Sequence, residues 1–385
     1  MEKWSYMNKT KYIYSSVGIM DDLLNLIEDE QSILVVSGKK TLDRIGFKTE
    51  IRNRGIEGLF EYVEGIEAEP KADKVYEGID IVKKRGIQLV LGVGGGSVID
   101  TAKAIGIGSE VDFDFFNFFE SKAVPVATKR VGVVLTCFGA GSEGSNGAVI
   151  TKGERKLSCG AELMRVTFAL CSSEMIKTMP QYQVRCALFD MFSHCFERYF
   201  TQVGGNGVSS SMLLSLMKIV IEYIDRGKLA NLLENDLLNL AYASRLCHDD
   251  GLAFRIKGDW ATHTIAHEIG AVTGLKHAET LSCVMPAWAE VTLEHDDMRG
   301  KRLLKEVFNW TPVEDVGKNL AISVKDIVNT LELTSVWDKC GNLGKESIDR
   351  IVDGACSTTI SGTVGNYRRL KREEVRRIVE KACSS

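Results

Sequence analysis

The chain has 385 residues, a length typical of two domains. Its apolar content of 44% and charged content of 26% are ordinary for a globular protein, and a net charge of −4 gives no hint of a nucleic-acid partner. Residues 1–6 lack the apolar core of a signal peptide, and the most apolar helical stretch, 212–224, contains Lys218 and Glu222. We therefore expect no membrane partner. The 10 cysteines form no CxxC pair, which predicts free thiols in the cytoplasm.

Short apolar runs alternate with helical patterns in the first half of the chain. A run of four to eight apolar residues that ends at turn residues is typical of a buried parallel strand. We predict strands at 33–36, 59–63, 87–93, 131–136 and 166–170, with helices over 71–85 and 98–105. This alternation predicts an α/β domain with a parallel, doubly wound sheet.

The second half, from about Pro180, shows helical spacing throughout and no convincing strand. We predict helices at 182–199, 212–223, 237–247, 259–269, 281–293 and 372–382. The chain is therefore expected to consist of a dinucleotide-binding α/β domain, residues 1–179, and an all-helical metal-binding domain, residues 180–385.

Three glycines at 94–96 end the predicted strand 87–93 and open a helix. Free backbone N–H groups at a helix start bind phosphate, and glycine lets the phosphate approach closely. Ser97 stands where the standard dinucleotide fingerprint needs glycine, so a tight turn without a ligand is the alternative. The Gly-rich loop 136–145 follows the next strand, so we expect both loops at the carboxyl edge of the sheet, where nucleotides bind.

Four histidines and one aspartate have the spacing of a metal site. His263 and His267 lie four residues apart and would share one face of a helix, as would Asp190 and His194, and His277 follows soon after. A carboxylate in the apolar surroundings of Asp190 is costly unless it is paired or binds a cation. Imidazole and carboxylate together suit Fe(II), Zn(II), Mn(II) or Co(II). Surface or packing histidines are the alternative.

These motifs lie in an order that resembles a known family. Residues 94–105 closely resemble the glycine motif of the iron-containing alcohol dehydrogenases, and 258–263 and 286–288 look like its butanol-dehydrogenase-like branch. The resemblance covers nearly the whole chain. The residues that match the four metal ligands of the family are Asp190, His194, His263 and His277.

The resemblance implies the dehydroquinate synthase-like fold, with a Rossmann-like domain followed by a helical metal domain. It implies Fe(2+), with Zn(2+) as a substitute, and it places His267 beside the nicotinamide, where it could relay a proton; a packing role for His267 is the alternative. The residues that it implies in dinucleotide binding are Gly95, Gly96, Ser97, Asp100, Thr136, Cys137 and Lys156.

The chain departs from the pattern of the family at several positions. Cys137 stands where a second Thr is usual, and Glu69 stands where Asn is usual. Ala278 follows His277 where the family has Gly, and Leu188 replaces a small residue. None of these changes removes a metal ligand, but they prevent assignment of the substrate by analogy.

The expected function is a metal-dependent, NAD(P)-linked alcohol dehydrogenase or aldehyde reductase that acts on a small, butanol-like substrate and assembles as a homodimer. A divalent cation would lower the pKa of an alcohol and polarise a carbonyl group. The alternatives are a lyase or cyclase of the dehydroquinate synthase type, glycerol-dehydrogenase-like polyol oxidation, a metal hydrolase, or a non-catalytic nucleotide-binding protein. The lyase would need many basic residues around the metal. Near the metal motifs the chain has Arg198, Arg255, Lys257 and Lys276.

The residues after strand 33–36 bear on the choice between NAD and NADP. An acidic side chain there would bind the ribose 2′-hydroxyl of NAD and repel the 2′-phosphate of NADP. The chain has Ser37, Gly38 and Lys39, with no acidic residue until Asp43. Serine can donate to a phosphate, glycine leaves room for it, and lysine supplies charge. The sequence therefore favours NADP(H) over NAD(H), with a solvated lysine pair as the alternative.

Overall fold

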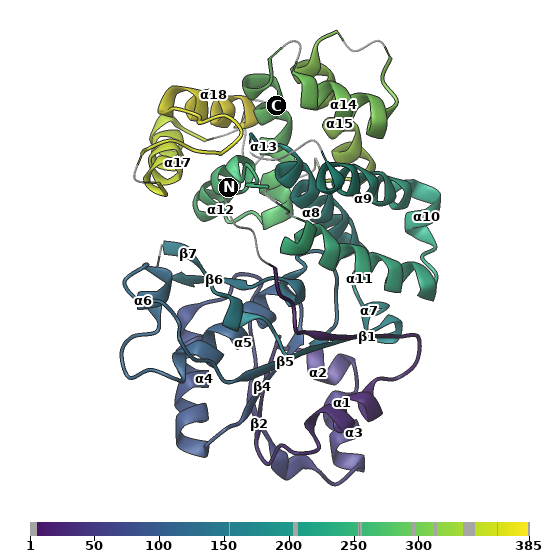
Figure 1. Ribbon diagram of the computed structural model, residues 1–385, viewed down its shortest axis with the longest axis vertical. Coiled ribbons are helices and arrows are strands. Elements are labelled where there is room, and N and C mark those ends of the chain that lie inside the picture. Colours follow the sequence, from purple (N-terminus) through teal and green to yellow (C-terminus); the bar gives the residue numbers. More distant parts are fainter. Residues whose placement is uncertain are drawn as a thin grey trace. The chain divides into compact units, whose positions relative to one another are not determined.

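A computed structural model describes residues 6–153, 155–202, 207–252, 254, 256–294, 297–311, 314–333, 343–359 and 361–383 (Figure 1). The chain divides into two compact units. One comprises Ser5–Pro180 and Leu232–Asp249, and the other comprises Gln181–Asn231 and Asp250–Ser385. The sequence placed the boundary at 179–180. In the structure the first unit ends at Pro180 and also takes in Leu232–Asp249, which the sequence assigned to the helical domain.

A parallel sheet forms the centre of the first unit, which we call the α/β unit. Within the described residues it has six strands in the order β1-β8-β5-β4-β2-β3. Their bounds are Lys11–Ser15 for β1, Ile33–Ser37 for β2, Phe60–Val63 for β3, Leu89–Gly94 for β4, Arg130–Leu135 for β5 and Phe168–Ser172 for β8. Five of these strands confirm predicted ones. The sequence missed β1 because this edge strand is half exposed and mixes polar with aromatic residues.

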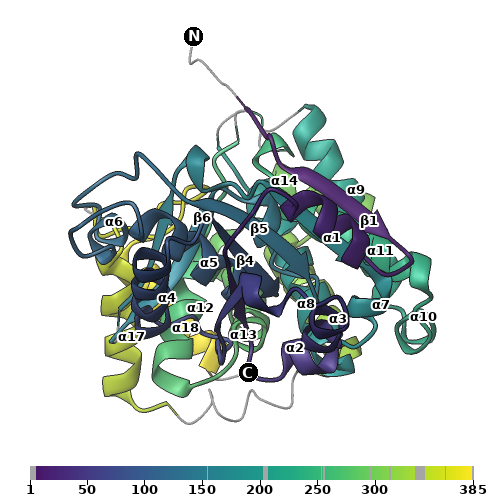
Figure 2. The ribbon, with the colours of Figure 1, turned by 90° about the horizontal axis from the view of Figure 1, so that it is seen from below.

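Helices cover both faces of the sheet because successive side chains of a buried strand point to opposite sides (Figures 1 and 2). Leu89, Leu91 and Val93 of β4 belong to an apolar core with α1, α2 and α3. On the other face, Gly92 faces α5, where a Cβ atom would lie 3.4 Å from Ala102. The bounds are Met20–Ile27 for α1, Thr41–Arg44 for α2, Phe47–Asn53 for α3, Ala72–Arg85 for α4 and Gly96–Gly108 for α5.

Smaller elements complete the α/β unit. The strands β6 and β7 form a separate antiparallel pair that the sequence did not predict, since charged and glycine residues interrupt their apolar pattern. Their bounds are Gly147–Lys152 and Arg155–Gly160. The short helices are η1 (Glu57–Leu59), α6 (Phe116–Phe119), η2 (Ser142–Gly144), η3 (Glu162–Met164) and α7 (Ser173–Ile176).

One helix from the second half of the sequence packs in the α/β unit. It is α11, Glu234–His248, and it contacts β8, α7 and η2. The Ser244 hydroxyl accepts a hydrogen bond of 2.8 Å from the Gly139 N–H. A Cβ atom on Gly141 would lie 2.7 Å from the Ser244 carbonyl oxygen, so the contact needs glycine there. Helical spacing predicted this helix at 237–247, but it did not reveal its packing partner.

The second unit, which we call the helical unit, consists of helices packed around α13 (Figure 1). This helix contacts α8, α12, α15 and α18, and its Trp288 side chain is fully buried against Phe196 and Phe200. The bounds are Gln181–Tyr199 for α8, Val208–Ile224 for α9, Arg226–Ala230 for α10, Asp250–Leu252 for η4, Ala261–Thr273 for α12, His277–Thr292 for α13, Met298–Phe308 for α14, Val316–Thr330 for α15, Lys345–Ser357 for α17 and Arg372–Cys383 for α18. Among the described residues, no helix is long and apolar enough to cross a membrane.

Candidate metal centre and dinucleotide site

Two predicted metal ligands lie on one face of α8. Asp190 and His194 are one helical turn apart, and the His194 Nε2 atom lies 3.8 Å from the Asp190 Oδ1 atom. Both residues are buried, with 9% and 5% of their surface exposed. A buried carboxylate is costly unless a positive or donating group compensates it. The position of Asp190 therefore favours a cation beside it.

The other two predicted ligands come from the helices α12 and α13. His263 lies in the first turn of α12, and Gly274 ends that helix with a φ of +69°, a conformation that glycine adopts easily. The chain then turns back, and His277 is the first residue of α13. The His263 ring centroid lies 5.0 Å from the ring centroids of both His194 and His277. Two helix starts thus bring the two histidines to the same face of α8.

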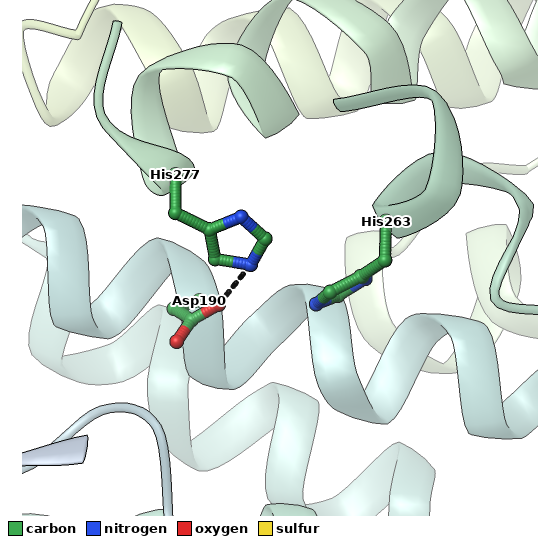
Figure 3. Close-up of side chains that lie close together, drawn as sticks. All are labelled: Asp190, His263 and His277. Carbon is green, nitrogen blue, oxygen red and sulfur yellow. Dashed lines mark ion pairs between the residues drawn. The ribbon is translucent and has the colours of Figure 1, made fainter. Parts of the chain in front are cut away.

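Three of the four side chains meet at one point, and His194 lies beside them. Ligand atoms of Asp190, His263 and His277 all lie within 4.8 Å of one another, and Figure 3 shows these side chains converging. The Asp190 Oδ1 to His277 Nε2 distance is 3.7 Å. Metal–ligand distances of about 2.0–2.2 Å place neighbouring ligands of a tetrahedral ion about 3.4 Å apart. The arrangement therefore fits one divalent cation with little adjustment, and His194 lies close enough to be the fourth ligand.

His267 lies one turn beyond His263 on α12, as the sequence predicted. Its ring centroid is 6.3 Å from that of His263 and 4.9 Å from that of His277. The residue is half-buried. His267 therefore borders the cluster, in a place where it could exchange protons with a group held there.

A further acid at the cluster, Glu197, was not among the predicted residues and also lies on α8. Its buried carboxylate accepts a hydrogen bond of 2.7 Å from the Thr262 N–H and pairs with Nδ1 of His263. A spacing signal was available, because Glu197 follows Asp190 by seven residues and therefore lies on the same helix face. Nearby, burial and then the charge of Glu197 raise the pKa of Asp259 to about 7.

The two predicted nucleotide loops lie side by side at the carboxyl edge of the sheet. β4 and β5 are paired in parallel, and the Thr136 N–H donates to the Gly94 carbonyl oxygen over 3.1 Å. A Cβ atom on Gly95 would lie 2.2 Å from the Cys137 Sγ atom. A side chain there would collide with the second loop, so the glycines have a role besides leaving room for phosphate. The N-cap residue of α5 is Gly95, which has no side chain. It therefore cannot accept a hydrogen bond from the first backbone N–H groups of the helix.

Some predicted nucleotide contacts are engaged within the protein. The Ser97 hydroxyl donates to the Ala68 carbonyl oxygen over 2.5 Å. The Asp100 carboxylate accepts the Val149 N–H over 2.9 Å, and burial raises the pKa of Asp100. The Ser97 side chain therefore binds the segment after β3, and the Asp100 side chain binds β6. Lys156 lies on β7, and its charge counteracts the rise in the Asp100 pKa.

A buried lysine ties α5 to the second loop. The Lys103 ammonium group donates to the carbonyl oxygens of Ser142 at 2.7 Å, Ser145 at 2.8 Å and Gly147 at 3.0 Å. Its side chain is fully buried. Charge-assisted bonds of this kind are stronger than neutral ones. The helix that starts at the glycines therefore also fixes the loop after β5.

The end of β2 has the residues that bear on nucleotide choice. Ser37 is buried, and its hydroxyl donates to the Gly38 carbonyl oxygen over 3.3 Å. A Cβ atom on Gly38 would lie 2.9 Å from the Thr41 hydroxyl oxygen, so this turn favours glycine. Lys39 is exposed at the start of α2.

Comparison with known proteins agrees with this geometry. The family model described as iron-containing alcohol dehydrogenase matches residues 10–173, and the one for the C-terminal part of the same family matches residues 186–383. The chain belongs to the iron-containing alcohol dehydrogenase family. It is therefore an oxidoreductase of the alcohol dehydrogenase and aldehyde reductase class, and it resembles the butanol dehydrogenases in that family.

Similar members of the iron-containing alcohol dehydrogenase family are known from several bacteria. A probable NADH-dependent butanol dehydrogenase of Bacillus subtilis is 32% identical over 391 residues, covering 97% of this chain and 98% of that protein. The NADPH-dependent aldehyde reductase YqhD of Escherichia coli is 27% identical over 328 residues, covering 82% of each. The crystal structure of NADH-dependent butanol dehydrogenase A from Thermotoga maritima has a TM-score of 0.90 at 23% identity and covers 99% of each chain. That structure confirms the fold.

The loop after β5, the second predicted nucleotide loop, contains a buried acid, Glu143, with 3% of its surface exposed. Within the described residues, its Oε1 atom has no hydrogen-bond partner, and burial raises its pKa to about 7. Burial also raises the pKa of Cys137, on the same loop, to about 11. Burial therefore favours the neutral form of both groups and extends it to higher pH than in water.

Glu143 should make the stability of the protein depend on pH. An unfolded glutamate has a pKa of about 4.3, so the folded state holds this proton more tightly. The resulting stabilisation is present below about pH 4.3 and is lost as the pH rises through about 7, a loss of about 4 kcal/mol. We expect Glu143→Gln to remove this loss. Urea denaturation of wild type and variant between pH 5 and 8 measures it, with exposed Glu77→Gln as the control. Parallel stability curves would contradict the prediction.

Proposed function

We propose that this chain is a metal-dependent aldehyde reductase and primary-alcohol dehydrogenase that uses NADP(H) and a small, butanol-like substrate. The observation that supports it best is the convergence of Asp190, His263 and His277 on one point of the helical unit, with the His194 ring beside Asp190. Two relatives, a probable butanol dehydrogenase and an aldehyde reductase, support this substrate class.

Asp190, His194, His263 and His277 would hold the cation. One carboxylate and three neutral imidazoles leave a divalent ion with a net positive charge, which attracts an electron-rich oxygen. When bound there, Fe(2+), or Zn(2+) in its place, would polarise the oxygen of an alcohol or aldehyde. His277 has a third of its side chain exposed, whereas the Asp190, His194 and His263 side chains are about 12% exposed or less. A substrate would therefore reach the cluster from the side of His277, which is the most exposed of the four side chains.

Other residues would bind the dinucleotide and move the proton. Backbone N–H groups at Gly96 and Ser97 would bind the pyrophosphate at the start of α5, with Thr136 and Cys137 contributing from the second loop. Lys156 would lie near the nicotinamide ribose. His267 would accept or deliver the proton at a ring nitrogen, since its ring lies beside that of His277.

The basic residues near the metal motifs do not favour the lyase alternative. Arg198 is buried, binds Asp250 over 3.2 Å and lies over the Trp260 ring. Lys276 lies over the Tyr182 ring, and Lys257 is exposed. Arg255 lies outside the described residues. Arg198 and Lys276 are therefore engaged within the protein, which does not favour a site for a phosphorylated, carboxylated substrate.

The preference for NADP(H) is supported by the end of β2. Exposed Lys39 follows Gly38 there, and the first acidic residue, Asp43, comes four positions after Lys39. The names of the relatives are divided, since one is NADH-dependent and another NADPH-dependent.

Homodimer formation and a cytoplasmic location stay predictions from the sequence. The described cysteines are all free thiols, which agrees with a reducing compartment.

His263→Ala should lose bound metal and butanal reduction together, because it removes one of the four ligands. Elemental analysis and NADPH oxidation measured on the same purified sample test this expectation. His248→Ala, which changes a histidine of the α/β unit, is the control for metal content. Full metal content in the His263→Ala protein would show that the site is misassigned.

His267→Ala should keep the metal while kcat falls by about 10²–10⁴-fold, the usual contribution of a general acid or base. The expectation follows from the position of the ring at the border of the cluster, where it binds no cation. Steady-state kinetics with metal analysis measure both quantities. An unchanged kcat would reduce His267 to a packing residue.

Lys39→Asp should move the ratio of kcat/KM for NADPH to that for NADH toward NADH. The change removes a positive charge and adds a negative one beside the 2′-phosphate, and a charge-assisted hydrogen bond accounts for about 10–100-fold. Initial rates with butanal and each nucleotide measure the ratio, with Lys84→Asp on α4 as the control. A wild-type preference of tenfold or more for NADH would refute NADP(H) use.

A further inference from the structure

We propose that Glu197 positions the metal ligand His263 by holding the proton of its Nδ1 atom, so that the Nε2 lone pair faces the cation. This inference rests on the proposed metal site, and it adds a residue that the ligand set does not include. Glu197 would not touch the metal or the substrate, and it would act through the ring of His263.

The geometry on α8 supports this assignment. Asp190, His194 and Glu197 follow one another at spacings of four and three residues, so they share one helix face. The first two lie at the metal cluster. The third extends to the adjacent start of α12, where its Oε2 atom pairs with the His263 Nδ1 atom. One helix face therefore provides two ligands and the partner of a third.

The pairing determines which ring nitrogen can bind a cation. A neutral imidazole has one protonated nitrogen and one lone pair. A carboxylate accepts a proton donor, so Glu197 favours the form of His263 with the proton on Nδ1 and the lone pair on Nε2. The ring is also held by stacking on His194 at an interplanar angle of 17° and by an edge contact with Trp260. Carboxylates commonly orient metal-binding histidines in this way, and their loss costs about 10–100-fold in metal affinity.

Glu197 has a second task that must be separated from the first. The N-cap residue of α12 is Trp260, which has a φ of +58° and no side-chain acceptor for the helix start. The Glu197 Oε1 atom accepts instead from the Thr262 N–H at 2.7 Å and the His263 N–H at 3.3 Å. The Glu197 carbonyl oxygen also accepts the Asp259 N–H over 2.8 Å. A role limited to capping would need an acceptor, but it would not need a carboxylate.

Glu197→Gln separates the two tasks. The glutamine oxygen can still accept from the Thr262 N–H, so the helix start keeps its cap. The amide NH₂ group now faces His263 Nδ1 and donates to it, which moves the ring proton to Nε2 and blocks the lone pair. We expect a folded protein whose dissociation constants for Zn(II) and Co(II) are about 10–100-fold weaker than those of wild type. Competition with a chromophoric chelator measures these constants without any assay of activity.

Glu279→Gln is the matched control. Glu279 is a buried acid that caps α13, where its Oε2 atom accepts the Lys276 N–H over 2.7 Å and its Oε1 atom pairs with the Tyr182 hydroxyl. It lies near His277 in sequence, but its carboxylate binds the Lys276 N–H and the Tyr182 hydroxyl. We expect this variant to retain wild-type metal affinity. Equal metal affinity of the Glu197→Gln and wild-type proteins, or an equal loss in both variants, would overturn the proposal.

Nitrogen NMR of the Zn(II)-loaded wild-type protein with labelled histidine gives a second test that needs no folded Glu197 variant. We expect a ring protonated at Nδ1 and bound through Nε2, with signals that are absent from the His263→Ala protein. A His263 ring bound through Nδ1 would overturn the proposal. A wild-type protein that binds neither Zn(II) nor Co(II) would instead overturn the proposed metal site.

Discussion

The gathering of one carboxylate and three imidazoles in the interior of the helical unit is the constraint on which the rest of that unit depends. A charge in such surroundings is expensive without a counter-charge, and a divalent cation provides it. Asp190 and His194 share the helix α8, but His263 and His277 come from the starts of two other helices, α12 and α13. Gly274 ends α12 and lets the chain turn back, and the buried packing of α13 holds His277 at the start of that helix.

The predicted nucleotide site of the α/β unit depends in a similar way on the positions of backbone N–H groups. Two loops that would bind one pyrophosphate must lie close together and keep their N–H groups accessible. Glycine at position 95 allows the approach, because a side chain would collide with Cys137. Lys103 and Asp100 then fix the second loop and β6 to the helix that starts at the first loop. The same helix thus offers its N-terminus to a phosphate and holds the neighbouring loop.

The two ring nitrogens of His263 have different partners in the proposed site. The cation would contact Nε2 of this ring, and Glu197 contacts Nδ1. The carboxylate also caps α12, so the orientation of the ring and the start of its helix are linked. A ligand held in this way loses little freedom when a metal binds, and preorganisation of that kind raises affinity.

The sequence by itself determined much of the fold and the choice of ligands. Apolar runs located five strands of the sheet because buried parallel strands must be continuously apolar. The spacing of Asp190, His194, His263, His267 and His277 suggested a metal site because helix geometry relates sequence distance to a shared face. The resemblance to the family then implied that four of these five residues, without His267, are the ligands. The glycines at 94–96 indicated a close approach at the end of a strand.

Only the tertiary structure decided which elements meet. The edge strand β1 and the pair β6–β7 lack a strong pattern, since they are partly exposed. Helix α11 had a clear helical pattern, but nothing in that pattern says that it packs on the loop at Gly139. The spacing of Glu197 from Asp190 gives its helix face, but not its contact with His263, because that partner is 66 residues away in the chain. The sequence gives the local spacing of residues directly, whereas their long-range partners depend on how whole surfaces pack.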